Sequence, residues 1–432
     1  MNMATADAIV VGAGVMGASI ALELSRAGFT CVVVDRGRAP GDGSTSASSG
    51  IVRFNYPTPD GVALSWESSA RWDAWEDHLG LVPDQGLATV DRCGMAFLDV
   101  PIFPRDRMVA LLTQAGIPVE EWGPGDLRAA YPGIDAGRHY PPKPVHSEAF
   151  LAEPRGELGA VYTPGAGYVG DPRLAVANLA EAGARQGVRF LLGHKVTGLR
   201  QVGTDWRVTL DDGQVLEAAV VVNAAGPWSS SVNRLAGVGD DFTVEVRPLR
   251  QEVHHLVAPA ALGERFPILA DADLGIYVRP DAAGHLLVGG TEPECDPLEW
   301  LDDPDESDPR PTQPRFEEQV WRAARRFPEL AVPNRARGLA GVYDAASDWT
   351  PVYDRVDADG FFVAMATSGN QFKNAPSVGS LMATLIQEVL AGHDHDADPV
   401  RFEATYTGGC VDLGAFSRKR ARNTATSGTV FG

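Results

Sequence analysis

Three glycines near the start of the chain have the spacing of a nucleotide-binding turn. Gly12, Gly14 and Gly17 form a G-x-G-x-x-G pattern between an apolar run and a helix-like run, and Asp35 follows 18 residues after Gly17. The first glycine permits a tight turn, the second lets the backbone approach a pyrophosphate, and the third lets helix and strand pack closely. An acid at the position of Asp35 would accept hydrogen bonds from ribose hydroxyls. The pattern predicts a dinucleotide site and leaves open whether the dinucleotide is NAD or FAD.

Two later polar segments also carry side chains that a site could use. Residues 41–57, GDGSTSASSGIVRFNYP, are rich in hydroxyls. Alone they could be a flexible linker, but directly after a nucleotide-binding unit their hydroxyls and amides could continue along phosphates. Residues 367–379, TSGNQFKNAPSVG, place Lys373 just before a run with helical spacing and an early proline. Taken alone, this second segment predicts a polar loop that caps a helix.

The bulk composition is that of a globular protein with an acidic surface. The chain has 432 residues, of which 44% are hydrophobic and 22% charged, with a formal net charge of -20. Such a charge repels nucleic acid and anionic membranes, so neither is expected as a partner. No segment has the pattern of a secretory signal or a membrane span, and we expect a cytoplasmic protein. The four cysteines are scattered, so we expect neither a disulfide framework nor a cysteine metal site. His254 and His255 are adjacent on a predicted strand and point to opposite faces, so they are not expected to bind one metal ion.

The elements that would position these residues alternate in type along parts of the chain. Residues 7–37 read as strand, turn, helix and strand, which implies a parallel pair with a right-handed crossover. Helices are predicted over 61–80, 103–116, 171–187 and 315–327, and strand candidates cluster between about 188 and 290. The acidic run 293–314 reads as a solvated loop with little chemistry, and the polar segment after Ser417 either lacks order or wraps the body. The pattern indicates a nucleotide-binding α/β domain built from several segments, with a β-rich domain inserted.

Three separated blocks resemble the superfamily of FAD-dependent enzymes that includes D-amino-acid oxidase, glycine oxidase and monomeric sarcosine oxidase. The blocks are residues 9–36, 220–237 (VVVNAAGPWSSSVNRLAG) and 360–379 (GFFVAMATSGNQFKNAPSVG). The resemblance implies an α/β fold (α+β overall) with a glutathione-reductase-like Rossmann FAD-binding domain. It places this domain in residues 1–90, 160–243 and 330–432. A substrate-binding domain with an antiparallel sheet would comprise 91–159 and 244–329.

The resemblance also implies which residues hold FAD. The ADP half would contact the glycine turn, the end of the second strand and a backbone group near adenine, and the flavin half would contact the hydroxyl-rich loop, the middle block and the C-terminal loop. The residues implied are Gly12, Gly14, Val15, Met16, Gly17, Asp35, Arg36, Ser44, Thr45, Ser46, Ser48, Ser49, Gly50, Val196, Ala225, Gly226, Trp228, Gly341, Gly369, Asn370, Gln371, Phe372 and Lys373.

Four residues are implied at the substrate. In sarcosine oxidase-like enzymes an arginine after the hydroxyl-rich loop and a lysine in the C-terminal loop grip the substrate carboxylate, and Arg53 and Lys373 match them. Two cations on one carboxylate suit a buried pocket, where a lone anion would be costly. Arg53 could instead form a structural salt bridge. Tyr277 and Arg279 lie on a strand expected to face the flavin. An equal alternative is that the Tyr277 ring packs within the sheet and the Arg279 guanidinium forms a surface ion pair.

Departures from the family pattern refine these expectations. Gly341 stands where covalent flavoenzymes of this type carry a cysteine, and the segment STSASSG lacks the histidine used by dimethylglycine dehydrogenase-like relatives, so FAD should be non-covalent. Leu287 stands where oxygen-activating members have a lysine, and Gly50 replaces a second arginine. Asn370 and Gln371 replace a histidine and a glycine, which favours a substrate other than sarcosine.

The expected reaction is oxidation of the C–N bond of a small amine or amino acid, secondary, N-methyl or of D configuration. Hydride would pass to flavin N5 and the imine would hydrolyse, with O2 or another electron acceptor completing the cycle. The alternatives are a flavoprotein dehydrogenase or electron-transfer subunit of a hetero-oligomer and, with less support, a flavin monooxygenase. The sequence leaves open the substrate, the choice between oxidase and dehydrogenase and the oligomeric state.

Overall fold

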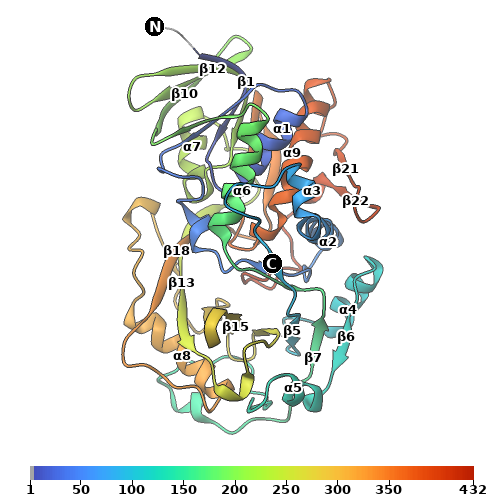
Figure 1. Cartoon of the computed structure of the whole chain (residues 1–432), viewed down its shortest axis with the longest axis vertical. Coiled ribbons are helices and arrows are strands. Elements are labelled where there is room, and N and C mark those ends of the chain that lie inside the picture. Colours follow the sequence, from blue (N-terminus) through green and yellow to red (C-terminus); the bar gives the residue numbers. More distant parts are fainter. Residues whose placement is uncertain (1–3) are drawn as a thin grey trace.

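A computed structural model describes residues 4–432, and in it the chain folds around two large sheets, one above the other in Figure 1. Five strands of the upper sheet run parallel: β1 (Ala4–Val11), β2 (Cys31–Asp35), β9 (Arg189–Leu192), β12 (Val215–Asn223) and β20 (Ala358–Met365). Three more strands extend it in antiparallel pairs: β10 (Val196–Val202), β11 (Asp205–Leu210) and β19 (Val352–Val356). Strands from three distant parts of the chain therefore form one sheet.

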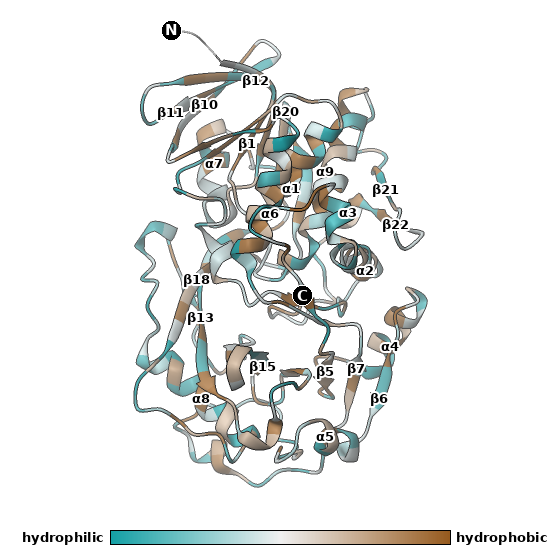
Figure 2. Cartoon of the chain, in the orientation of Figure 1, coloured by the Kyte–Doolittle hydropathy of each residue, from teal (hydrophilic) through white to brown (hydrophobic). Residues whose placement is uncertain are grey.

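The central strand of the upper sheet is buried on both faces. Ala8 and Val10 of β1 join the core formed with the helices, whereas Ile9 and Val11 join the core on the opposite face. This alternation follows from the period of two along a strand. The helices beside this sheet are α1 (Val15–Arg26), α6 (Pro172–Arg185), α7 (Ser229–Ala236) and α9 (Ala375–Leu390). Figure 2 shows the apolar colour along the strands between them.

The lower sheet is mainly antiparallel. Its strands are β5 (Met95–Leu98), β6 (Glu120–Trp122), β7 (Ala160–Thr163), β13 (Val246–Val257), β14 (Ile268–Asp271), β15 (Ile276–Asp281), β16 (His285–Gly290), β17 (Glu299–Trp300) and β18 (Gly338–Ala346). The helices near it are α4 (Arg105–Gln114), α5 (Pro124–Ala130) and α8 (Gln313–Arg326). β7 and β18 pair in this sheet although they fall in segments predicted for the first domain, and the domain boundaries stay a prediction.

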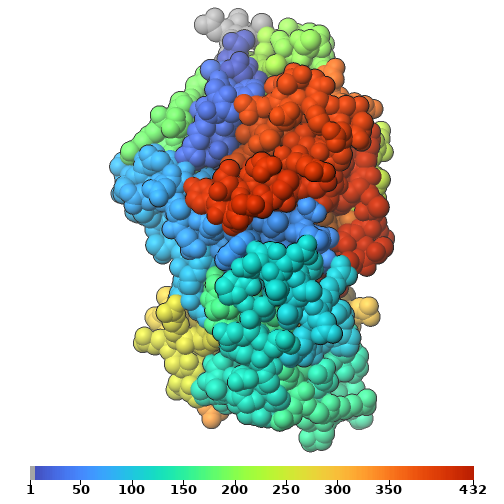
Figure 3. All heavy atoms as spheres, turned by 90° about the vertical axis from the view of Figure 1, so that its right-hand side faces the viewer, coloured from blue at the N-terminus to red at the C-terminus, as the bar shows by residue number. Residues whose placement is uncertain are grey.

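Short elements complete the structure between and beside the sheets. They are β3 (Ile51–Val52), β4 (Val90–Asp91), β8 (Gly167–Val169), β21 (Arg401–Ala404), β22 (Gly409–Asp412), α2 (Pro59–Asp73) and α3 (Trp75–Leu79). Figure 3 shows the blue N-terminal and red C-terminal parts packed together in the upper half, with the teal segment that contains α4 and α5 below them.

Most predicted elements form, with different ends. Asp171 caps α6 by accepting from the backbone N–H groups of Arg173 and Leu174, as its sequence predicts. The helix predicted over 61–80 is instead two helices, because the backbone at Ala74 leaves helical geometry. The adjacent histidines differ in exposure, with His254 fully buried and His255 partly exposed. The segment after Ser417 wraps the body, and its residues Val430 and Phe431 are buried.

Candidate functional site

The glycine turn between β1 and α1 brings bare backbone to one side of the sheet. Gly12 has φ +111, and a Cβ there would lie 2.3 Å from the carbonyl oxygen of Ala224. A Cβ on Gly17 would lie 1.9 Å from the carbonyl oxygen of Gly12, so this position must be glycine for α1 to pack against the turn. Gly14 is the N-cap of α1, and its nearest obstacle is the hydroxyl of Thr45. The first turn of α1 therefore offers N–H groups and the positive end of its dipole to an anion.

A cavity of about 570 Å³ starts at this turn and runs between the two sheets. It is lined by most of the residues predicted to hold a cofactor: Gly12, Gly14, Val15, Met16, Asp35, Arg36, Ser44, Thr45, Ser48, Ser49, Val196, Ala225, Gly226, Trp228, Gly341, Gly369, Gln371 and Phe372. The predicted residues that do not line it are Gly17, Ser46, Gly50, Asn370 and Lys373. Of these, Gly17 and Gly50 serve close backbone packing, since a Cβ on Gly50 would lie 2.3 Å from the carbonyl oxygen of Val169.

Asp35 lies at the end of β2 and is already engaged by the protein. One carboxylate oxygen accepts from the backbone N–H of Ala13 at 2.6 Å, and the other accepts from that of Gly37 at 2.6 Å. A carboxylate has about four acceptor sites, so Asp35 can still accept from hydroxyls in the cavity. These two bonds fix the carboxylate at the mouth of the glycine turn.

The acidic loop 293–314 does contribute to the cavity, contrary to the expectation from sequence. Asp303 and Asp305 line it. Asp305 lies 2.6 Å from the guanidinium of Arg36 and accepts from the indole N–H of Trp228 at 2.8 Å. Arg36 in turn stacks on the Trp228 ring at 4.5 Å. A segment that composition alone marks as solvated thus closes the outer end of the cavity.

Arg53 and Lys373 come together around one aromatic ring, although they are 320 residues apart. The Arg53 guanidinium lies 4.7 Å from the centre of the Tyr56 ring, and the Lys373 ammonium lies 4.8 Å from it. Burial, with Arg53 nearby, holds the pKa of the Lys373 ammonium well below its usual range. Within residues 4–432 neither cation has a carboxylate at ion-pair distance: Lys373 donates to the carbonyl of Asn370, and Arg53 to those of Asn55 and Val430.

Tyr277 and Arg279 share a face of β15 but reach different surroundings. Tyr277 lines the cavity, and its ring lies over Gly289 of the next strand, where a Cβ would be 2.3 Å away. Arg279 is buried against the ring of Tyr168 at 4.1 Å and does not line the cavity. It is paired across the sheet with Leu287, the residue at the position of the oxygen-activating lysine. The structure therefore places only Tyr277 of this pair at the cavity.

The loop that precedes α9 has a strained backbone conformation. Ala366 and Ser368 have positive φ angles of 59° and 48°, a conformation that non-glycine residues keep only where their surroundings impose it. Asp344 of β18 imposes it by accepting from the side chain of Thr367 and, through its carbonyl oxygen, from the backbone N–H of Ser368. Burial raises the pKa of the Asp344 carboxyl. Gly369 can then lie against the ring of Tyr343, a cavity residue that the sequence patterns do not indicate.

The described residues contain one candidate metal site and no candidate membrane-spanning helix. In the part of the chain that the structure describes, one group of three side chains could hold a metal ion, namely His194, Asp211 and Asp212. Both aspartates are exposed, and exposed acidic groups of this kind are common without a metal. No helix among the described residues is both long and apolar enough to cross a membrane.

Comparisons with known proteins agree with this geometry. The family model described as FAD dependent oxidoreductase matches residues 7–385. FAD-dependent oxidoreductase domain-containing protein 1 of Bos taurus is 27% identical, over 93% of this chain and 85% of that protein. The glycine oxidase of Geobacillus kaustophilus is 25% identical, over 90% of this chain and 94% of the enzyme.

Solved structures show the same fold. L-Proline dehydrogenase from P. horikoshii superposes with a TM-score of 0.74 at 19% identity, covering 96% of this chain and 98% of the other. The solved glycine oxidase from Geobacillus kaustophilus gives a TM-score of 0.71 at 23% identity, covering 91% of this chain and 98% of the other. The expected α/β architecture, with a Rossmann FAD-binding region and an antiparallel sheet, is therefore confirmed. With its family model matched over most of its length, the chain belongs to the FAD-dependent oxidoreductase family.

Proposed function

We propose that this protein uses FAD to oxidise the C–N bond of a small amino acid, with secondary, N-methyl and D-amino acids as the substrates to test first. The observation that carries the proposal is the pair of buried cations, Arg53 and Lys373, beside the Tyr56 ring and without a carboxylate partner among the described residues. Burying a charge without a counter-charge is costly, so such a pair is best explained by an anionic ligand. The relatives of this chain include a glycine oxidase and a D-amino acid dehydrogenase, which fits a substrate with a carboxylate.

The residues that line the cavity suit FAD by their chemistry. Gly12 and Gly14 leave room for a pyrophosphate at the N-terminus of α1, and Asp35 is fixed where ribose hydroxyls would lie. Ser44, Thr45 and Ser49 would continue along the ribityl chain, and Gly369, Gln371 and Phe372 would lie at the isoalloxazine. Gly341 lines the cavity in place of a cysteine, which supports a cofactor held without a covalent bond.

In the proposed reaction the protein orients the substrate and sets its charge. Arg53 and Lys373 would hold the carboxylate, while the apolar and aromatic surroundings disfavour the ammonium form and leave an amine lone pair to form the C=N bond. Bound FAD would supply the electron acceptor for the C–H bond that breaks. Water then hydrolyses the imine to a carbonyl compound and an amine or ammonia.

A dehydrogenase or electron-transfer subunit is the second candidate, and Leu287 favours it. This residue is buried and apolar, so the position offers no cation to promote reaction with oxygen. A flavin monooxygenase has less support, because residues 367–373 form the strained loop at the cavity instead of the Gly-Asp motif typical of that class.

The test is anaerobic titration of the purified, yellow holoprotein with N-methyl, cyclic and D-amino acids. Loss of the oxidised flavin absorbance with at least one of them supports the proposal. A protein that does not take up FAD, or a bound flavin that no member of the panel reduces, would contradict it. Acid precipitation should release FAD into the supernatant if the cofactor is non-covalent. Mixing the reduced enzyme with air then separates an oxidase, which reoxidises rapidly, from a dehydrogenase.

A further inference from the structure

The last nine residues, 424–432, return to the centre of the molecule and are called the tail below. Figure 1 marks the C-terminal end of the chain between the upper and lower sheets. Within the tail, Gly432 donates its backbone N–H to the carbonyl of Thr429 at 2.9 Å, and its carbonyl accepts from the hydroxyl of Ser427 at 2.7 Å. Thr429, Val430 and Phe431 are buried. The tail is a compact turn inserted between the two sheets.

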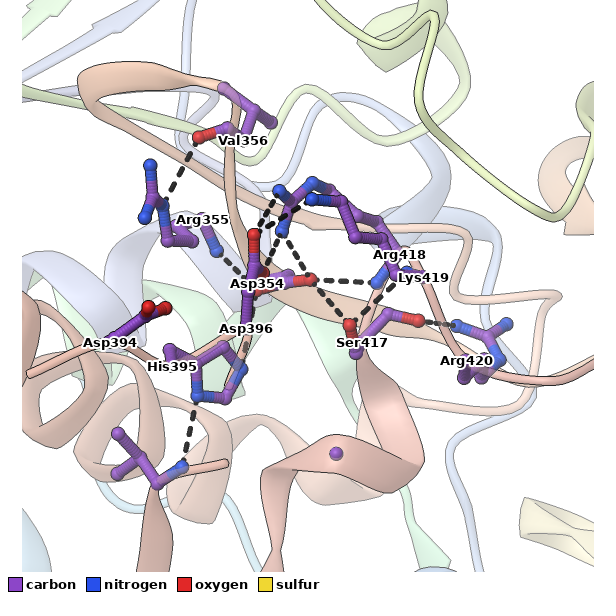
Figure 4. Close-up of polar contacts among 12 residues, drawn as sticks. Asp354, Arg355, Val356, Asp394, His395, Asp396, Ser417, Arg418, Lys419 and Arg420 are labelled. Atoms are coloured by element: carbon purple, nitrogen blue, oxygen red, sulfur yellow. Dashed lines mark hydrogen bonds and ion pairs between the residues drawn. The ribbon is translucent and has the colours of Figure 1, made fainter. Parts of the chain in front are cut away.

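The segment before the tail is fixed by a buried ion network, and Figure 4 shows the part of it around Asp354, Asp396 and Arg418. The guanidinium of Arg418 donates to Asp354 at 3.1 Å, to Asp396 at 2.8 Å and to Asp241 at 2.6 Å, and it is fully buried. Arg420 adds a second pair, to Asp348 at 2.9 Å. The tail therefore starts from a fixed point, and the ion pairs of this network are formed by residues that precede it.

The main chain of Val430 is held at both ends, by a guanidinium on one side and a carboxyl group on the other. Its carbonyl oxygen accepts from the Arg53 guanidinium at 2.9 Å, and its backbone N–H donates to the Glu292 carboxylate at 2.8 Å. The N, Cα, C and O atoms of one residue are the same atoms, at the same spacing, as those of a free α-amino acid. Val430 is thus bound as an amino acid would be bound, with its oxygen on the predicted carboxylate ligand and its nitrogen on an acid.

Phe431 secures this position through an aromatic cluster. Its ring lies 5.1 Å from that of Phe97 and 5.4 Å from that of Phe103, both in edge contact, and the Arg53 guanidinium lies 5.3 Å from its centre. Gly432 packs against Tyr56, where a Cβ would come within 3.2 Å of the ring. The tail therefore covers the same two residues, Arg53 and Tyr56, that surround the proposed carboxylate site.

The backbone conformation and the hydrogen bonding of Glu292 are those expected of a ligand-binding residue. It has a positive φ of 48°, which is unusual for a glutamate, and its second carboxylate oxygen is buried without a partner among residues 4–432. Burial raises the pKa of the Glu292 carboxyl to about 8, and this carboxyl acts electrostatically on Tyr277 and Tyr343, which line the cavity. An unpaired buried carboxyl oxygen beside the cavity is an acceptor for a substrate amine.

We propose that Arg53 and Glu292 bind the carboxylate and the amine of an α-amino-acid substrate, and that the tail occupies this site as an internal pseudosubstrate that the substrate displaces. The inference rests on the proposed function for the identity of the substrate. It adds the residue that recognises the amine and a tail that competes with the substrate.

The test uses two ligands of equal shape on the FAD-loaded full chain, titrated by the change in flavin absorbance. 2-Aminoisobutyrate has no α-hydrogen and cannot be oxidised at that carbon, and pivalate replaces its amino group with a methyl group. The wild-type protein should prefer 2-aminoisobutyrate, and Glu292→Gln, which still accepts from the Val430 N–H, should lose that preference. Equal affinities in the wild type, or an unchanged preference in Glu292→Gln, would overturn the assignment of Glu292.

The tail is tested with Phe431→Ala, which removes the aromatic anchor. Both ligands should bind about tenfold more tightly than to the wild type, because less binding energy is then used to displace the tail. Phe150→Ala is the matched control, since Phe150 is also buried and lies 5.1 Å from an arginine guanidinium, that of Arg325. It should leave both affinities unchanged. Equal affinities in Phe431→Ala and Phe150→Ala would overturn displacement of the tail.

A second measurement keeps the test valid if Phe431→Ala does not fold. In the wild-type protein, saturating 2-aminoisobutyrate should raise the amide hydrogen exchange of residues 427–432, and Val430→Pro, which removes the N–H bonded to Glu292, should tighten ligand binding. Unchanged exchange in these residues would contradict the tail's role. None of these measurements requires turnover, so a failure of the proposed oxidation, seen as a flavin that no amino acid reduces, is distinguishable from a failure of this inference.

Discussion

Arg53, Lys373 and Tyr56 form a small buried group in which two cations share one ring. Each cation lies within 5 Å of the ring centre, an attractive geometry for a positive charge over an aromatic face. Burial raises the pKa of the Tyr56 hydroxyl, although the Arg53 charge opposes this rise. Burial and the Arg53 charge together lower the pKa of Lys373, so the group contains one permanent charge and one that responds to its ligand. The predictions at this scale concern those two charges.

The first prediction is that Arg53→Ala weakens carboxylate binding without loss of the cofactor. Charge-assisted hydrogen bonds to a carboxylate contribute about 1.5–3 kcal/mol, so KM for the best amino acid should rise by about one to two orders of magnitude. The FAD content should match that of the wild type, because Arg53 does not line the cavity. Steady-state kinetics with flavin quantification check this, and an unchanged KM in Arg53→Ala would show that the carboxylate binds elsewhere.

The second prediction concerns pH and Lys373. An anion favours the charged ammonium, so pivalate affinity should be greatest where Lys373 is protonated and should fall as pH rises through its lowered pKa. The pivalate affinity can fall by at most about tenfold per pH unit, which is the limit for the loss of one proton. Glu292 also titrates nearby, so the measurement is made in the Glu292→Gln background. Adding Lys373→Met should flatten the profile, and a slope that survives this change must come from another group.

At the scale of elements, the β1–α1–β2 unit has one glycine with positive φ in each of its two turns. Gly12 and Gly28 both have positive φ, at 111° and 94°. A Cβ on Gly12 would also collide with the carbonyl of Ala224, whereas a Cβ on Gly28 would meet nothing within 4 Å. The two positions separate the conformational requirement from the steric one within a single strand–helix–strand unit.

The third prediction uses these two glycines as variant and control. Gly28→Ala should lower the free energy of unfolding by about 1–2 kcal/mol, the usual cost of a left-handed alanine, and should keep a full complement of FAD. Gly12→Ala should lose most of its FAD, because the turn and the β12–α7 loop must separate. Flavin content and denaturant unfolding measure both effects. Equal FAD content in the two variants would contradict the steric argument.

At the scale of the whole molecule, the cavity lies between sheets that draw on distant parts of the chain. β1, β12 and β20 meet in the upper sheet, while β18 crosses to the lower sheet and brings Gly341 and Tyr343 to the cavity. The C-terminal segment then connects the two halves, through the Arg418 network at one end and through Val430 at the other. The C-terminal segment therefore contributes to stability through Arg418 and to the contacts around Arg53 through Val430.

The fourth prediction tests the contribution of the Arg418 network to stability. Arg418→Ala leaves Asp354 buried without its cation, and breaking a buried pair in this way typically costs about 3–5 kcal/mol. The Tm should fall by several degrees. Arg310→Ala, which removes an exposed pair with Asp308, should leave Tm unchanged. Calorimetry of the holoproteins measures the Tm of each variant. Equal Tm values for the two variants would mean that the network does not stabilise the fold.

By itself the sequence determined the local features of this protein: the glycine turn, the capped helices and the hydroxyl-rich loop. It could do so because short-range sterics and the periods of helix and strand act within a few residues. The partners of Arg53, the contribution of Asp305 to the cavity, the position of Glu292 and the return of the tail required the tertiary structure. These contacts join residues far apart in the chain, and the composition of a polar segment does not determine which surface it will meet. Only the packing of the two sheets decided that Val430 lies between Arg53 and Glu292.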